Sequence, residues 1–135
     1  MRLISCLALA SLMAASPAFA HHDGKGPVGS VRITQPVMAG GKLLEPGVYE
    51  IRDTGEHVMP MPGQSADAEE YIEFVRNGQV VAREVAELTS DEGRPVGTSG
   101  SATSPIRFEM LKGGDFGRVS FTRGGERYLI HLPTK

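Results

Sequence analysis

Apolar and polar residues alternate in several segments of the chain, and this alternation restricts those segments to β-structure. In "SVRIT" (30–34), the apolar residues Val31 and Ile33 alternate with polar neighbours. The segments "GVYEIR" (47–52) and "PIRFEML" (105–111) repeat the pattern. A period of two places one set of side chains on a buried face and the other in solvent. These segments therefore predict strands that each bury one face.

Two pairs of turn residues predict β-hairpins. Asn77-Gly78 lies within "YIEFVRNGQVVAREV" (71–85), and Gly124-Gly125 lies within "GRVSFTRGGERYLIHL" (117–132). Both dipeptides supply the positive φ angles of a two-residue type I′ turn. In the second hairpin this turn pairs Arg123 with Glu126, Phe121 with Tyr128, Val119 with Ile130, and Arg118 with His131. One apolar face results, formed by Val119, Phe121, Tyr128, Ile130 and Leu132.

The remaining segments predict turns and loops. "MAGGKLLEPG" (38–47) is typical of a further turn, and longer loops are expected over 53–69 and 89–104, the second of which is rich in Gly, Ser and Thr. The fold class is therefore predicted as all-β: a small antiparallel β-sandwich or partly closed barrel of six to seven strands. It would occupy residues 30–135 as one domain.

Residues 1–20, "MRLISCLALASLMAASPAFA", have the features of a secretory signal peptide. Arg2 supplies the positive charge, an apolar stretch follows, and Ala18-Phe19-Ala20 ends it as a small-x-small cleavage site. We expect cleavage after Ala20, which leaves a polar leader over 21–29. The predicted location is the periplasm or the outside of the cell, and no transmembrane segment is expected in the mature chain.

Cysteine content and charge exclude several classes of function. The single cysteine, Cys6, lies within the predicted signal peptide, so the mature chain would have neither disulfides nor thiolate ligands. The formal net charge of the whole chain is −2, and removal of Arg2 makes it more negative by one. No basic patch stands out. Nucleic acid is therefore not an expected partner.

Half of the mature chain resembles small secreted bacterial β-domains of uncharacterised function. The resemblance lies in "GGKLLEPGVYEIR" (40–52), with its Gly-Lys turn and Leu-x-x-Gly-x-Tyr entry into a strand, followed by "EFVRNGQVVARE" (73–84). These are turn and strand residues. The resemblance therefore implies a fold and assigns no catalytic residue.

The stretch "EHVMPMPG" (56–63) is the strongest candidate for a metal site. Thioether sulfur favours Cu(I), and imidazole binds both Cu(I) and Cu(II). In a regular strand His57, Met59 and Met61 would share one face. The intervening prolines favour polyproline II instead, in which positions two apart diverge. A proline-stiffened loop thus remains the alternative to a soft-metal site.

Copper has two further sources of support. His57-Val58-Met59 resembles the closing His-x-Met of small periplasmic copper chaperones, whose β-sandwich site also gathers further methionines. The resemblance implies Met38 and Met61 as additional ligands. The upstream spacing of this sequence differs from that of the family. Cleavage after Ala20 would also make His21 the N-terminus, whose amine and imidazole chelate copper, and His22 adds a nitrogen. The alternative is a polar leader without metal.

Other candidate groups favour structural roles. His131 lies opposite Arg118 and is predicted as a solvated strand histidine. Met110 is expected in the core, and Met38 beside a turn is open to either role. Arg107, Arg118, Arg123 and Arg127 are expected on one exposed face, where they bind an acidic partner or form surface ion pairs. Asp67, Glu69, Glu70 and Glu73 are predicted to form a solvated acidic loop edge.

Catalysis has no matching motif in the sequence. "GTSGSA" (97–102) lacks the G-x-S-x-G arrangement of a nucleophile elbow, and no cysteine nucleophile remains after cleavage. We therefore expect an exported, non-enzymatic module that binds a protein or envelope component. The alternative is a periplasmic copper-binding or copper-delivery protein that uses His57, Met59, Met61, His21 and His22.

Overall fold

The computed structural model describes residues 25–90 and 105–135, and all regular structure in these two ranges is β-structure. The strands are β1 (Gly26–Ile33), β2 (Val37–Ala39), β3 (Lys42–Leu44), β4 (Gly47–His57), β5 (Glu69–Arg76), β6 (Gln79–Ser90), β7 (Arg107–Met110), β8 (Phe116–Arg123) and β9 (Glu126–Pro133). The predicted all-β class is confirmed.

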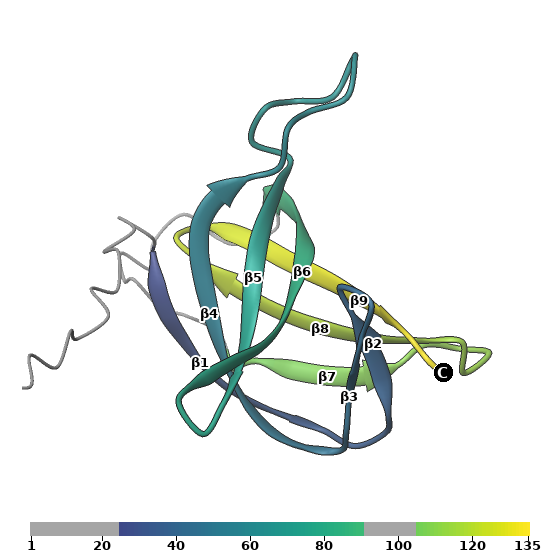
Figure 1. Ribbon diagram of the computed structural model, residues 1–135. Helices are drawn as coiled ribbons and strands as arrows, with labels where there is room; N and C mark the ends of the chain where they lie inside the picture. The colour runs from purple at the N-terminus through teal and green to yellow at the C-terminus, as the bar shows by residue number, and fades with distance from the viewer. Residues whose placement is uncertain (1–24, 91–104) are drawn as a thin grey trace, which may run out of the picture.

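Seven strands form one antiparallel sheet in the order β1-β4-β5-β6-β9-β8-β7, and β2 and β3 form a separate hairpin. The large sheet curls into a half-barrel (Figure 1). Its two edge strands, β1 and β7, lie near each other without pairing. A methyl group added at Gly29 would lie 3.3 Å from Ile106 Cδ1, so an apolar side chain covers this unpaired seam. The partly closed barrel is thus the form that the chain adopts.

Both predicted hairpins are present with the expected turns. Asn77 and Gly78 have φ angles of 52° and 75°, and Gly124 and Gly125 have φ angles of 61° and 83°. All four predicted pairs of the β8–β9 hairpin are observed. The rings of Phe121 and Tyr128 stack with their centroids 4.6 Å apart. The turn chemistry and the alternating pattern together define this register.

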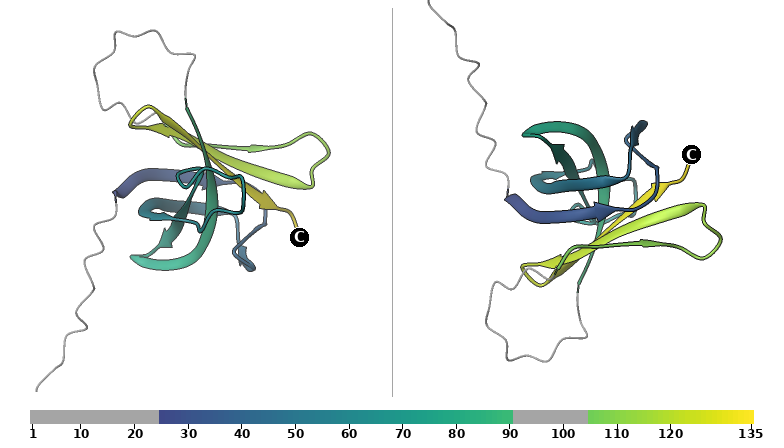
Figure 2. Two further views of the ribbon diagram at one scale, coloured as in Figure 1. Left: turned by 90° about the horizontal axis from the view of Figure 1, so that it is seen from above. Right: turned by 90° about the horizontal axis from the view of Figure 1, so that it is seen from below.

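Inward-facing residues of both hairpins, of β1 and of β4 form a single core. Its fully buried side chains include Ile33, Ile51, Phe74 and Ile130. The small β2–β3 hairpin packs against β6 and β9 (Figures 1 and 2). Its apolar residues Val37, Ala39 and Leu44 are buried.

The tip of the β2–β3 hairpin requires glycine. Gly40 has a φ of +54°, and a Cβ at this position would lie 2.1 Å from the carbonyl oxygen of Arg83 on β6. Its backbone N–H donates to Glu84 Oε2 at 2.7 Å. The hairpin therefore approaches β6 backbone to backbone, at a distance that excludes any side chain.

Several predicted boundaries differ from the structure. The first strand begins at Gly26 rather than Ser30, so part of the expected leader is ordered strand, with a register shift between Pro27 and Gly29. The strand predicted over 47–52 continues to His57, and β6 continues to Ser90. Residues 1–24, which include the predicted signal peptide, and residues 91–104 lie outside the described ranges.

Candidate functional site

Two carboxylates lie inside the half-barrel at one end. Asp53 on β4 and Glu70 on β5 have fully buried side chains. Asp53 follows Ile51 at the next inward position, and Glu70 precedes Ile72 in the same way. In each strand an acidic residue therefore occupies an inward position next to an inward apolar residue. Because burying a charge without partners is costly, these groups require compensating contacts.

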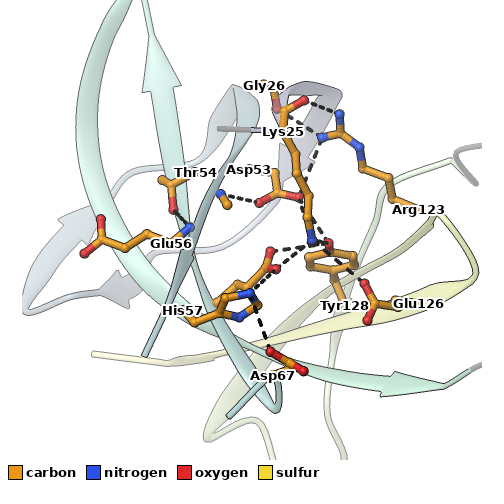
Figure 3. Close-up of polar contacts among 12 residues, drawn as sticks. Lys25, Gly26, Asp53, Thr54, Glu56, His57, Asp67, Arg123, Glu126 and Tyr128 are labelled. Atoms are coloured by element: carbon orange, nitrogen blue, oxygen red, sulfur yellow. Dashed lines mark hydrogen bonds and ion pairs between the residues drawn. The ribbon is translucent and has the colours of Figure 1, made fainter. Parts of the chain in front are cut away.

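Tyr128 on β9 and Lys25, at the start of the described chain, supply these contacts (Figure 3). The Tyr128 hydroxyl lies 3.1 Å from Asp53 Oδ2 and 3.4 Å from Glu70 Oε2, and it donates its one hydrogen to this pair. Lys25 Nζ donates to Glu70 Oε1 at 2.6 Å and to the Tyr128 hydroxyl oxygen at 2.9 Å. The same ammonium lies 3.8 Å from Glu126 Oε2.

Arg123, at the end of β8, holds the backbone beside Lys25. Its guanidinium donates to the carbonyl oxygens of Lys25 and Gly26 and lies 3.7 Å from Asp53 Oδ2. β1 is one edge strand of the sheet, and β8 is next to the other edge strand, β7. We call Lys25, Asp53, Glu70, Arg123 and Tyr128 the polar clasp, because they join the first strand to the last hairpin across the open side of the half-barrel.

Burial and charge shift the titration of the polar clasp. Burial raises the pKa of Glu70 above its ordinary value, and the neighbouring carboxyl of Asp53 adds to this shift. Burial also raises the pKa of the Tyr128 hydroxyl to about 12. For Lys25, burial acts to lower the pKa, but hydrogen bonds to Glu70 and Tyr128 outweigh it and the pKa is raised. Tyr128 is therefore neutral and Lys25 charged at neutral pH.

The polar clasp contains groups suited to acid–base chemistry, but its geometry is closed. Asp53 and Glu70 have no exposed side-chain surface, and the Lys25 head group lies against them. Among the residues that the structure describes, no buried side-chain nitrogen or oxygen lacks a hydrogen-bond partner. Neither carboxyl group is open to a substrate in this structure. The arrangement thus favours a structural role.

His57 lies at the edge of the polar clasp. It is the last residue of β4 and pairs with Glu70 on β5. Its Nε2 lies 3.6 Å from Glu70 Oε1 and 3.8 Å from Asp67 Oδ1, and the side chain is 43% exposed. Figure 3 shows the ring beside Asp67. The predicted solvated acidic edge is therefore wrong for Glu70, which is buried, whereas Asp67 is exposed.

Met59 and Met61 lie in the loop between β4 and β5, which we call the β4–β5 loop (residues 58–68). This loop projects beyond the sheet at the top of Figure 1. Met59 is 88% exposed and Met61 is 73% exposed. Val58 N–H donates to the Glu69 carbonyl at 3.0 Å and closes the base of the loop. The sequence stretch thus forms a defined projection with two thioethers in solvent.

The tip of the β4–β5 loop is a hydrogen-bonded turn. The Gln64 N–H donates to the Met61 carbonyl at 2.9 Å, and the Met61 N–H donates to Gln64 Oε1 at 3.1 Å. Ala68 on the returning arm accepts a bond of 2.8 Å from the N–H of Leu88 on β6. These contacts involve the backbone and Gln64 rather than the methionine side chains. The loop therefore keeps its form without burying either thioether.

The predicted metal ligands occupy different surroundings. His57 adjoins the carboxylates at the loop base, while Met59 and Met61 lie in the solvated loop, and His21 and His22 lie outside the described residues. Over residues 25–90 and 105–135, no group of three or more His, Cys, Asp or Glu side chains is arranged to hold a metal ion.

The other candidates have mixed outcomes. His131 is exposed and pairs with Arg118, as expected. Met110 on the edge strand β7 is only half-buried, and so is Met38. Arg118 pairs with Glu109 at the surface. Arg123 does not lie on the exposed arginine face that the sequence predicts, because its guanidinium turns toward the backbone of Lys25 and Gly26.

No family model, curated protein or solved structure matches this chain in the comparisons made. Both resemblances drawn from the sequence therefore stay predictions. No helix within the described ranges combines the length and hydropathy needed to cross a membrane.

Proposed function

We propose that this protein is an exported, non-enzymatic module that binds a protein or envelope component through the β4–β5 loop. The exposure of Met59 and Met61 carries this proposal. Methionine is commonly buried, and unbranched thioether side chains adapt well to apolar pockets of a partner. Neither residue belongs to the core cluster. Export is inferred from the features of residues 1–20.

The loop has the properties of a preorganised binding element. Its base and tip are held by hydrogen bonds, and Pro60 and Pro62 restrict the backbone φ angles beside both methionines. Less conformational entropy is then lost when a partner binds. Burial of one methionine side chain contributes about 1.5–3 kcal/mol. Two such side chains supply a useful part of the free energy of a specific complex.

Site-specific photo-crosslinking in cells tests this function. A photo-reactive phenylalanine analogue replaces Ser65, which is exposed in the loop and leaves both methionines intact. The matched control places the analogue at Val80, which is 48% exposed beside the β5–β6 turn, away from the loop in Figure 1. We expect an adduct of one defined mass from position 65 that position 80 does not give. No adduct at position 65, or the same adducts from both positions, would overturn the proposal.

Copper binding is the second candidate function. It is favoured by the two thioethers, which have no role in the core and lie two and four residues after His57. Native mass spectrometry of the mature protein, isolated from cells grown with added copper, tests it. One copper ion that is lost in the variant carrying His57→Ala, Met59→Ala and Met61→Ala would support it. A metal-free protein that also takes up no Cu(I) under reducing conditions would exclude it.

A further inference from the structure

The four methionines of the mature chain differ sharply in their access to solvent. Met59 and Met61 are 88% and 73% exposed, whereas Met38 on β2 and Met110 on β7 are half-buried. An oxidant reaches a thioether through solvent, so its reaction rate depends on this exposure. The protein therefore contains two strongly exposed methionines in one loop and two half-buried methionines within the same fold.

We propose that Met59 and Met61 form an oxidation site through which peroxide switches off binding by the β4–β5 loop. The thioether sulfur attacks one oxygen of hydrogen peroxide, and the O–O bond breaks as the S–O bond forms. Sulfur loses two electrons and becomes a sulfoxide. The second peroxide oxygen takes those electrons and the remaining protons and leaves as water. A methionine sulfoxide reductase, with a thiol as reductant, reverses the modification.

Oxidation at this site leaves the fold intact. The core cluster contains neither Met59 nor Met61. The hydrogen bonds that shape the loop join backbone groups and the Gln64 side chain, and none involves sulfur. The polar clasp also contains no sulfur. A sulfoxide oxygen at either position therefore enters solvent without displacing a packed group.

The consequence for binding rests on the proposed function. A sulfoxide replaces an apolar, flexible side chain with a polar one and opposes its transfer into an apolar pocket. Loss of one buried methionine contact weakens binding by about tenfold or more. Oxidation of both residues would then release the partner. The oxidation site itself does not depend on the identity of that partner.

The first measurement follows the oxidation of the mature, folded protein by hydrogen peroxide. Proteolysis at timed intervals and mass spectrometry of the peptides give a rate for each methionine. Met38 and Met110 serve as internal references under identical conditions. We expect Met59 and Met61 to oxidise several-fold faster than both references, with an unchanged thermal midpoint. Equal rates at the loop and reference residues would overturn the proposed site.

The second measurement compares photo-crosslinking from position 65 in untreated protein, in protein treated with peroxide before irradiation, and in peroxide-treated protein that is then reduced before irradiation. The reduction uses a mixture of both methionine sulfoxide reductases. We expect no adduct from the oxidised protein and the original adduct from the reduced protein. A variant with Met59→Leu and Met61→Leu keeps apolar side chains without sulfur, and its adduct should persist in peroxide. An adduct that persists in the oxidised wild type would overturn the switch. If the untreated protein gives no adduct, the proposed binding function fails, while the peptide rates still decide the oxidation site.

Discussion

Replacement of Lys25 with methionine removes the ammonium that the buried carboxylates of Asp53 and Glu70 face. Breaking a fully buried ion pair costs about 3–5 kcal/mol. The Lys25 side chain is 39% exposed, so water reaches its head group and partly replaces the lost contact. We therefore expect Lys25→Met to lower the free energy of unfolding by about 1–3 kcal/mol at pH 7.

The pH dependence of this loss gives a second, independent readout. The hydrogen bond from Lys25 lowers the pKa of Glu70, so its removal raises that pKa further above the ordinary value of 4.5. Between 4.5 and the raised pKa, the native state binds more protons than the unfolded state. Stability then falls as pH rises through this interval. The effect of Lys25→Met should be larger at pH 7 than at pH 4.5.

Equilibrium urea unfolding, followed by far-ultraviolet circular dichroism at both pH values, measures these effects. The chain has no tryptophan, and its three tyrosines provide a second optical probe. Lys42→Met is the matched control, because Lys42 lies exposed on β3. Its effect should stay within about 0.5 kcal/mol. If Lys25→Met lowers the free energy of unfolding no more than Lys42→Met, or lowers it equally at both pH values, Lys25 does not compensate the buried carboxylates.

Two further perturbations test other parts of the fold. Gly40→Ala should lower the free energy of unfolding by about 2–4 kcal/mol, because the added Cβ would collide with the carbonyl of Arg83 and the φ angle is positive. The control is Gly41→Ala, which has open space around the added Cβ. In the same urea titration it should lower the free energy of unfolding by less than half as much. Stability should fall above pH 10, because the pKa of Tyr128 rises from 10.0 to about 12 on folding and that of Lys25 is also raised. Both groups hold their protons more tightly in the native state, so a Tyr128→Phe variant should show a shallower alkaline decline; an equal decline would contradict the role given to this hydroxyl.

The β8–β9 hairpin could be predicted to the level of single residue pairs. A two-residue turn at Gly124-Gly125 fixes the register, and the alternation of apolar residues selects the same register. Both signals are local. The β5–β6 turn at Asn77-Gly78 was predictable for the same reason. These two hairpins could be predicted because the turn residues and the alternation of apolar and polar residues favour the same strand pairing.

The polar clasp could not be recognised from local patterns. Its members lie far apart in the chain, and Lys25 meets Tyr128 only because the sheet curls. One signal was present: Asp53 and Glu70 stand at inward positions, two residues from Ile51 and Ile72 respectively. An acidic residue usually ends such a series. Only the tertiary partners show that the strands continue through these carboxylates.

The β4–β5 loop was predicted as a proline-stiffened loop or a soft-metal site, and its ordered projection from the sheet was not predicted. The hydrogen bonds that close it join residues on both arms and contact β6. These contacts depend on the longer course of β4 to His57. The exposure of Met59 and Met61 follows from that geometry rather than from composition.

Above all, we propose that the apolar side chains of Met59 and Met61 mediate binding and do not stabilise the fold. The most direct measurement compares the yield of the position-65 adduct in two variants at equal amounts of folded protein. One carries Met59→Ser and Met61→Ser, and the other carries Met59→Leu and Met61→Leu. We predict that the serine variant loses the adduct and the leucine variant keeps it. Equal yields from both variants would contradict the claim.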